Sequence, residues 1–532
     1  MADATRPEPL TDAIVSPRAA FAVVGALLAV RLLAMIADPN SLYADETQYW
    51  LWSRELDWGY FSKPPLIAWV IAATTAVFGD ADWAVRLAAP FLHAATAGFL
   101  GLAAARLFGE ARIGALAAIL WAVMPGVWLS SQIISTDAVL MTGWSAGLYC
   151  LIRLRDGPSW PHAVGLGLAI GWAFLAKYAA IYFLLGAGLS ILMDAPVRRA
   201  LISAQGLTAG AIVLALLSGN LAWNAANDFA TVSHTAANAN WGGPLFNLED
   251  FTDFFTGQMG VFGPISFVLL LLAVIQVCRS SARGWNQARP RLMLVLFTLP
   301  PLLIVSIQAF ISRAHANWAA SAYGAGTILL AWFLLSGPRW RRGALAATLA
   351  LHLVTGFALL AFAASIPLSD AAGLANAYKR VREWPLTAER VELAAARTGA
   401  AALAFDNRND FHQMQRYGEV DAPLYMWRRY EGAHNFAEAE WPLPEDVAEP
   451  VLIVSERPEE IALMARDFAR FEPAGEIRIP LGGGRERVYN LFSASGFNPL
   501  ERGADYEAQV EDWREAYGAP DSASSPQTSR RR

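Results

Sequence analysis

Residues Tyr43 to Pro65 read YADETQYWLWSRELDWGYFSKPP, and the organisation of the whole chain follows from them. The stretch combines two adjacent carboxylates, Asp45 and Glu46, with six aromatic residues after them and with Lys63 before two prolines. The 532-residue chain around it is 55% hydrophobic and only 16% charged, whereas soluble domains carry about 25% charged residues. A polar cluster in so apolar a chain indicates a segment at the surface of a membrane-embedded protein.

Long apolar runs recur from residue 19 to residue 366, which predicts a mainly α, polytopic membrane protein. The eleven predicted spans are roughly 19–37, 84–105, 113–130, 138–152, 162–176, 179–193, 201–222, 260–278, 292–311, 316–336 and 343–366. The 162–193 region is also compatible with a single kinked element. The first run lacks a convincing small-residue cleavage site, so we interpret it as a retained span rather than a signal peptide.

A further apolar run, Leu66 to Gly79, is too short to cross comfortably, and charge asymmetry decides its place. If it lies on the membrane surface and residues 1–18 are cytoplasmic, the arginine clusters fall in the inner loops, at 106–112, 153–155, 198–199, 279–291 and 339–342. If it crossed, every later loop would change sides and the positive-inside rule would fail. We therefore expect interfacial helices within a first periplasmic loop, 38–83, and a second large periplasmic loop, 223–259, which contains no Lys or Arg.

The composition changes after about residue 366. Residues 367–495 mix helix-like runs with strand-like ones, which predicts a small soluble α/β domain on the periplasmic side. The helix-like runs are Ala372–Val381, Thr387–Arg397 and Glu459–Ala469, and the strand-like runs are Ala401–Phe405, Val451–Ser455, Glu476–Pro480 and Arg487–Phe492. Gly482–Gly484 is interpreted as a turn. Residues 496–532 are polar and are expected to be disordered.

Composition also limits the function. A net charge of −5 argues against nucleic acid as a partner. Cys150 and Cys278 lie at the ends of apolar runs and are expected to pack rather than to form a disulfide. The sequence contains no metal-type cluster of Cys and His, so no cofactor is predicted with certainty, and a divalent cation held by carboxylates remains open.

Several polar residues fall at the outer ends of spans. Asp137 follows Ser135 and Thr136 after the third span, Lys177 and Tyr178 follow the fifth, and SRAHANWAA lies between the ninth and tenth. Each has a structural explanation of its own: Asp45 with Glu46 as a solvated pair or a helix cap, Asp137 as part of a cap, Lys177 as a snorkelling lysine, and Arg313 with its tryptophan as an interfacial anchor.

Taken together, these residues indicate a catalytic site that binds a phosphate group. Lys63, Lys177 and Arg313 come from separate outer loops on a face that is otherwise almost free of cations, and cations bind phosphate through charge-assisted hydrogen bonds. Asp45, Glu46 and Asp137 supply carboxylates that can take a proton from a hydroxyl or orient a sugar. We therefore predict transfer of a sugar from a lipid phosphate. The residues predicted to contact substrate are Tyr43, Tyr60, Tyr178, His315 and Asn317.

The motifs YADETQYWLWSRELDWGYFSKPPLIAWVIA, FGDADWAVRLAAP, ISTDAVL, FLAKYAA and AHANWAA resemble those of the bacterial family 39 glycosyltransferases of the GT-C superfold, over roughly residues 15–340. Protein O-mannosyltransferases and the lipid A aminoarabinose transferase are relatives. The resemblance implies a polyprenyl-phosphate-linked donor, inversion at the anomeric carbon and periplasmic chemistry in the inner membrane. It matches Asp45 to the principal loop acid, Lys63 to the basic position before the loop proline, Asp137 to the acid after the third span and Lys177 to a basic residue beside the donor phosphate. Arg313 and His315 match a more variable motif.

Two other functions remain open at this point. A transporter or flippase of lipid-linked sugars would need a polar path across the membrane and related halves of the chain, and neither is visible. A scaffold protein would leave the one-sided set of cations and carboxylates unexplained. The sequence does not identify the sugar or the acceptor, for which lipid A, the lipopolysaccharide core, another envelope glycan and a protein hydroxyl are all compatible.

Overall fold

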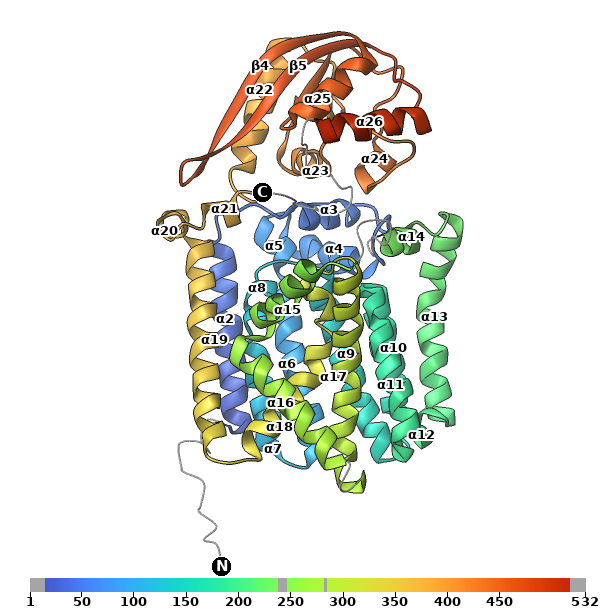
Figure 1. Cartoon of the computed structure of the whole chain (residues 1–532), viewed down its shortest axis with the longest axis vertical. Helices are drawn as coiled ribbons and strands as arrows, with labels where there is room; N and C mark the ends of the chain where they lie inside the picture. The colour runs from blue at the N-terminus through green and yellow to red at the C-terminus, as the bar shows by residue number, and fades with distance from the viewer. Residues whose placement is uncertain (1–14, 238–245, 282–284, 517–532) are drawn as a thin grey trace, which may run out of the picture. The chain divides into compact units, whose positions relative to one another are not determined.

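The computed structural model describes residues 15–237, 246–281 and 285–516. The chain forms two compact units (Figure 1). The membrane unit comprises the chain up to Asp38 together with Leu56–Ala364, and the sheet unit comprises Pro39–Glu55 together with the chain from Ser365 onward. The predicted first loop, 38–83, is thus divided between the two units after Glu55.

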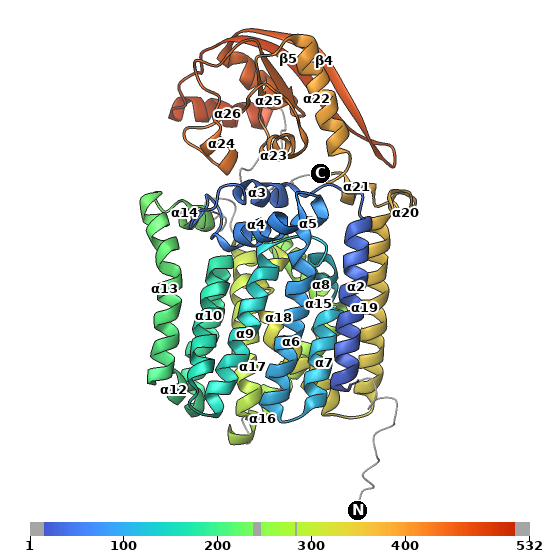
Figure 2. The same cartoon turned by 180° about the vertical axis from the view of Figure 1, so that it is seen from behind.

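The membrane unit is a bundle of helices that run side by side (Figures 1 and 2). Its helices are α2 (Pro17–Ala37), α4 (Leu66–Phe78), α5 (Asp82–Arg86), α6 (Ala88–Phe108), α7 (Ala111–Ala122), α8 (Pro125–Ser130), α9 (Thr136–Asp156), α10 (Trp160–Ala176), α11 (Ile181–Met193), α12 (Ala195–Leu201), α13 (Ala204–Ala226), α14 (Ala230–Ala237), α15 (Leu248–Phe262), α16 (Pro264–Ser281), α17 (Trp285–Ile311), α18 (Ala322–Leu335) and α19 (Trp340–Ala364). Two short 3-10 helices, η1 (Tyr178–Ala180) and η2 (Ala316–Ala319), precede α11 and α18.

Among the described residues, six helices are long and apolar enough to span a membrane: Pro17–Ala37, Asp82–Phe108, Ala204–Ala226, Pro264–Ser281, Arg289–Ile311 and Trp340–Ala364. Five shorter apolar helices accompany them: Leu66–Phe78, Ala111–Ala122, Trp160–Ala176, Tyr178–Met193 and Ala322–Leu335. The protein is therefore a mainly α, multi-pass membrane protein, as predicted. The total of eleven crossings stays a prediction.

Helix α4 corresponds to the apolar run Leu66 to Gly79, which the charge asymmetry predicts to lie on the membrane surface. Its 13 residues span about 20 Å at about 1.5 Å per residue, less than the roughly 30 Å of a hydrocarbon core. It contacts α6, α9 and α10 and lies across the end of the bundle in both views (Figures 1 and 2). Its location on the membrane surface stays a prediction.

The sequence explains two breaks between helices, of which one divides a predicted span and the other separates two predicted spans. The 113–130 span is divided into α7 and α8, because Pro125 at the start of α8 cannot continue the preceding helix. The 162–193 region forms two separate helices, because Lys177 has an extended backbone, with φ −163° and ψ 134°. The predicted second loop, 223–259, contains the end of α13, all of α14 and most of α15, and its residues 238–245 lie outside the described part of the chain.

The sheet unit contains a five-stranded mixed sheet in the order β2-β1-β3-β5-β4. Its strands are β1 (Ala402–Phe405), β2 (Leu424–Met426), β3 (Val451–Ser455), β4 (Phe468–Gly482) and β5 (Arg485–Phe497). Strand β1 pairs in parallel with β2 and β3, whereas β5 is antiparallel to β3 and β4. Its helices are α3 (Ala44–Trp52), α20 (Ile366–Ala371), α21 (Ala375–Tyr378), α22 (Trp384–Thr398), α23 (Arg408–Tyr417), α24 (Phe436–Glu440), α25 (Pro458–Met464) and α26 (Ala504–Ala516), with the 3-10 helix η3 (Ala465–Asp467).

Both faces of the sheet are buried at β1. Leu403 and Phe405 of β1 belong to one apolar cluster, while Ala402 and Ala404 belong to another. Alternate residues of a strand point to opposite faces, so the short parallel strand is covered on both sides. The predicted turn at Gly482–Gly484 joins β4 to β5, and all three glycines have positive φ, of 83°, 56° and 73°.

The structure corrects several boundaries predicted for this region. The helix-like run 372–381 contains only the four-residue α21, and the run 459–469 ends early because β4 begins at Phe468. Strand β2 and helices α23 and α24 were not predicted. The segment expected to be disordered from residue 496 instead contains α26 at Ala504–Ala516, since Tyr506 and Val510 are buried in an apolar cluster of the sheet unit. Residues 517–532 lie outside the described part.

Candidate active site

Three of the predicted site residues meet in the membrane unit. The Nζ atom of Lys177 donates to Oδ1 of Asp137 at 2.7 Å, and Nδ2 of Asn317 donates to Oδ2 of the same carboxylate at 2.8 Å. The side chains of Asp137 and Lys177 are only 16% and 21% exposed. An ammonium group has three donors, and this bond uses one of them, so Lys177 can still bind an anion. We call these three residues the Asp137 cluster.

Local structure explains how three elements deliver these side chains. Asp137 lies in the first turn of α9, after the N-cap Ser135, whose side chain makes no capping hydrogen bond. Lys177 follows the last residue of α10, where the extended backbone separates that helix from η1. Asn317 lies in η2. The negative carboxylate near a helix N-terminus also interacts favourably with the helix dipole.

Tyr178, beside Lys177, belongs to a second polar group. Its hydroxyl donates to Oδ1 of Asn220 at 2.8 Å and accepts from Nδ2 of Asn224 at 3.1 Å. Nδ2 of Asn220 donates to the backbone oxygen of Trp58 at 2.7 Å. Both asparagines are buried on α13, so this group ties α13 to the 56–65 loop and fixes the backbone next to Lys177.

The 56–65 loop, which carries Lys63, is held at several points. Asp57 accepts a hydrogen bond of 2.6 Å from Nε1 of Trp223, and Trp69 donates to the backbone oxygen of Asp57 at 3.0 Å. The hydroxyl of the buried Tyr60 accepts a hydrogen bond from the backbone N–H of Asp57 at 3.2 Å, so it stabilises the loop. The backbone N–H of Tyr60 donates to the oxygen of Lys63 at 3.1 Å, which closes the turn before the prolines.

The η2 region holds the remaining predicted residues of the membrane unit. His315 is exposed, and its ring packs edge-on against Trp318 at 5.5 Å between centroids. Arg313 is half-buried. The buried Gln258 of α15 donates to the backbone oxygen of Ala316 at 3.1 Å and so helps to place η2. This supporting amide was not among the predicted site residues, although a glutamine within an apolar run is a signal for such a role.

Asp45 and Glu46 belong to the sheet unit, and the structure gives them different environments. Glu46 is 2% exposed, and its Oε2 accepts from the backbone N–H of Tyr43 at 2.9 Å. This bond is half of a capping box at the start of α3. Asp45 is 65% exposed at its side chain, and its Oδ1 lies 3.6 Å from Nη2 of Arg408. The capping alternative therefore applies to Glu46, whereas the carboxylate of Asp45 is exposed. Arg408 was not predicted.

A buried acidic group follows the parallel strands β1 and β3. Oγ of Ser455 donates to Asp406 at 3.0 Å, and Nε of Arg457 lies 3.8 Å from the same carboxylate. Burial raises the pKa of Asp406 above its usual range. Burial, and after it the negative charge of Glu456, raises the pKa of Asp410 further still. This group could not be predicted from the sequence, because its acids do not form a recognisable motif.

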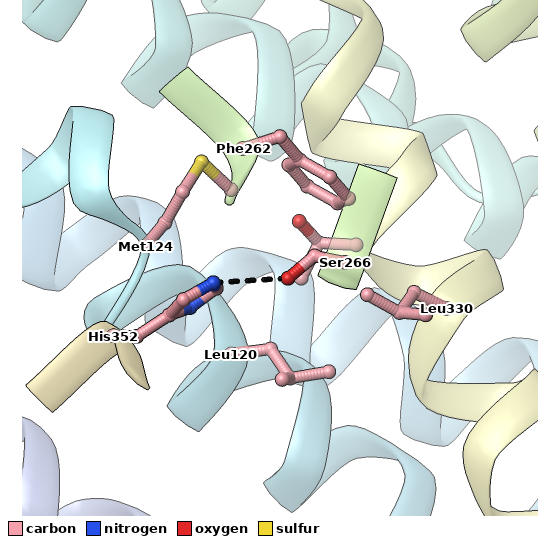
Figure 3. Close-up of a pocket in the computed structure, with 7 residues that line it drawn as sticks. Leu120, Met124, Phe262, Ser266, Leu330 and His352 are labelled. Carbon is pink, nitrogen blue, oxygen red and sulfur yellow. Dashed lines mark hydrogen bonds between the residues drawn. The ribbon is translucent and has the colours of Figure 1, made fainter. Parts of the chain in front are cut away.

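A small pocket lies elsewhere, inside the membrane unit (Figure 3). Its apolar lining residues are Leu120, Met124, Phe262 and Leu330, and its polar ones are Ser266, Thr327 and His352. Ser266 and His352 point toward each other and are hydrogen-bonded at 3.0 Å. None of the predicted site residues lines this pocket. Over residues 15–237, 246–281 and 285–516, no group of three or more His, Cys, Asp or Glu side chains is arranged to hold a metal ion.

Comparisons with known proteins place the chain among sugar-transferring membrane proteins. Residues 62–223 match the family of dolichyl-phosphate-mannose-protein mannosyltransferases. The lipid A galacturonosyltransferase RgtD of Rhizobium johnstonii is 34% identical over 448 residues, which are 83% of this chain and 91% of that protein. The lipopolysaccharide core galacturonosyltransferase RgtA of the same organism is 26% identical over 202 residues, 38% of this chain and 40% of that protein.

A solved structure shares the fold. The crystal structure of ArnT from Cupriavidus metallidurans bound to undecaprenyl phosphate superposes with a TM-score of 0.61 and 18% identity, covering 90% of this chain and 99% of that one. The apo crystal structure of the same protein gives the same TM-score over 91% of this chain and 100% of that one.

Proposed function

Because the chain belongs to the GT-C glycosyltransferase family that includes the lipid A galacturonosyltransferase RgtD of Rhizobium johnstonii, we propose that it transfers a sugar from a polyprenyl phosphate to an envelope acceptor. The observation that carries this proposal is the match to that relative over most of both chains. It favours lipid A as the acceptor and a hexuronic acid as the sugar, ahead of the lipopolysaccharide core, another glycan or a protein hydroxyl. Since the family consists of transferases, we do not retain the transporter alternative.

The donor is inferred from fold and charge together. ArnT, which shares the fold, has been crystallised with undecaprenyl phosphate. In the present chain, Lys177 supplies a cation that Asp137 and Asn317 hold in place, and such a cation suits a phosphate of the donor. Lys63 and Arg313 are proposed to bind the same phosphate. The site then faces the periplasm at the inner membrane, where lipid-linked donors are available.

The proposed reaction is a single in-line displacement. The acceptor oxygen forms a bond to the anomeric carbon while the bond from that carbon to the phosphate oxygen breaks, so the anomeric configuration inverts. Lys177 and its partner cations stabilise the negative charge that develops on the leaving polyprenyl phosphate. Asp45 takes the proton when the acceptor is a hydroxyl, and mainly positions the acceptor when that acceptor is already an ionised phosphate. Glu46 supports Asp45 by capping α3.

The test is transfer by the purified, full-length protein in lipid nanodiscs. The substrates are undecaprenyl-phosphate-linked galacturonic acid and lipid A, and the product is measured by mass spectrometry. Asp45→Asn should lower transfer by about 10²- to 10⁴-fold, the usual contribution of a general base. Because Asp45 is exposed, the melting temperature should not change.

Asp446→Asn is the matched control, since Asp446 is an exposed acid of the same unit. Transfer by Asp45→Asn at the wild-type rate would refute the role of Asp45. Absence of any uronic acid transfer by the wild-type protein, together with unchanged lipid A in a deletion strain, would refute the proposed donor and acceptor.

A further inference from the structure

The segment that carries Asp45 is built into the sheet unit through α23. The backbone N–H of Leu42 donates to the hydroxyl of Tyr417 at 2.8 Å, and the backbone oxygen of Leu42 accepts from Nε2 of Gln413 at 2.8 Å. Oγ1 of Thr47 donates to Oε1 of Gln413 at 3.3 Å. Thr47 and Gln413 are almost completely buried. A buried amide that satisfies two partners fixes the register of α3 against α23.

Aromatic contacts strengthen the same attachment. The ring of Trp52, 1% exposed, packs edge-on against Phe436 with 5.5 Å between centroids. The guanidinium of Arg416 lies over the ring of Trp50, 4.3 Å from its centroid. Helix α3 therefore keeps a defined orientation relative to α23, and so does the side chain of Asp45 in its first turn.

Arg408 is placed where α23 begins. Oδ1 of the N-cap Asn407 accepts from the backbone N–H of Asn409 at 3.0 Å, and Phe411 is buried in the core of the sheet unit. This arrangement anchors the first turn. Nη1 of Arg408 donates to Oε1 of the buried Gln48 at 3.2 Å, which leaves the other terminal nitrogen, Nη2, 3.6 Å from Oδ1 of Asp45. One guanidinium thus joins a buried amide of α3 to the exposed acid of α3.

We propose that Arg408 is a positioning residue, through which the sheet unit holds the carboxylate of Asp45 in the orientation needed for transfer. The inference rests on the proposed function, because it assumes that Asp45 acts on the acceptor. The side chains of Arg408 and Asp45 are 38% and 65% exposed, and exposed ion pairs add only about 0–1 kcal/mol to stability. Loss of this pair should therefore affect the orientation of Asp45 much more than folding.

The experiment measures kcat and the KM for donor and acceptor with full-length variants in nanodiscs. Arg408→Gln should lower kcat about 10- to 100-fold, the cost of a misplaced catalytic group, with each KM within about threefold of wild type. Arg408→Lys should recover part of that loss, because it restores a cation without the planar fork. Arg390→Gln is the matched control, since Arg390 is an exposed arginine of α22 in the same unit, and it should leave kcat unchanged.

The possible results distinguish the positioning role of Arg408 from the proposed sugar transfer on which it rests. If Asp45→Asn is inactive while Arg408→Gln keeps wild-type kcat, the positioning role is wrong and the proposed function stands. If Arg408→Gln raises the KM of the acceptor without changing kcat, Arg408 binds substrate instead. A fall in kcat that matches an equal loss of folded protein, measured by the melting temperature, would make the residue structural.

Discussion

The Nζ atom of Lys177 lies 2.7 Å from Oδ1 of Asp137, and this contact joins the end of α10 to the first turn of α9 across 40 residues of sequence. Asn317 completes the arrangement at the other carboxylate oxygen, at 2.8 Å. A cation held on one side by a carboxylate keeps a fixed position and still has donors for a second anion.

Lys177→Gln removes the cation and leaves the carboxylate of Asp137 without its ion-pair partner. Hydrogen bonds to charged groups contribute about 1.5–3 kcal/mol, so transfer should fall about 10- to 100-fold, through a higher KM for the donor and a lower kcat. Lys379→Gln, which removes an exposed lysine of the sheet unit, should have no effect. Steady-state kinetics with varied donor would check this, and an unchanged donor KM for Lys177→Gln would contradict the phosphate-binding role.

Asn317→Asp keeps the size of the side chain but replaces a donor by a second negative charge beside Asp137. Like charges this close repel, so the Asp137 cluster should open and transfer should fall more than in Asn317→Ala. The comparison needs only initial rates at neutral pH. Asn227→Asp, on the exposed end of α13, adds the same charge elsewhere and should be close to wild type. Equal rates for Asn317→Asp and Asn317→Ala would show that charge at this position is unimportant.

Gly219→Ala tests the packing of the 56–65 loop on α13. A Cβ atom at Gly219 would lie 2.4 Å from Cε3 of Trp58, whereas one at Gly210 of the same helix would have no heavy atom within 4 Å. Overpacking of this kind costs about 1–3 kcal/mol, so Gly219→Ala should lower the melting temperature and reduce transfer. Gly210→Ala should be neutral or slightly stabilising, because alanine favours a helix over glycine. Melting curves that do not distinguish the two variants would contradict the observed packing.

Asp410→Asn should make the stability of the sheet unit less dependent on pH. The pKa of Asp410 is raised in the folded state by burial and by Glu456, above an ordinary value of 3.8. A raised folded pKa gives stability that is complete below the unfolded pKa and is lost as pH rises through the folded pKa. The variant should therefore gain stability relative to wild type as pH increases from about 4 toward neutrality. Melting temperatures of full-length protein at a series of pH values would measure this gain.

The same series with Asp446→Asn provides the control, because that exposed residue has the same formal charge. It should follow the wild-type curve. If the difference between Asp410→Asn and wild type is constant with pH, Asp410 does not change its protonation over the range tested.

All three residues of the Asp137 cluster could be predicted from the sequence, because each lies in a short motif at the end of an apolar run. Charge asymmetry predicted that Lys177 and Asn317 lie on the same side of the membrane. In the sheet unit, the strand Val451–Ser455 was predicted from its continuous apolar residues. The pairing of Lys177 with Asp137 could not be predicted, because it depends on the backbone of Lys177 leaving the helical conformation.

The different environments of Asp45 and Glu46 could not be predicted from the sequence either. The two acids are adjacent and chemically alike, and only the direction of α3 decides that Glu46 caps the helix while Asp45 is exposed. Helix α23 was missed for a related reason. Its buried face carries polar residues such as Asp410, His412 and Gln413, so the apolar periodicity that normally predicts a helix is weak there.

The chain enters the sheet unit at Pro39, leaves it after Glu55 and returns at Ser365. The C-terminal region is therefore not an independent module that recombination could exchange on its own. A chimera that took residues from 365 onward from a relative would pair a foreign α23 with the native α3, and Trp52 and Thr47 would lose their native partners Phe436 and Gln413. Exchange between such transferases should succeed only when Pro39–Glu55 is inherited with its C-terminal partner.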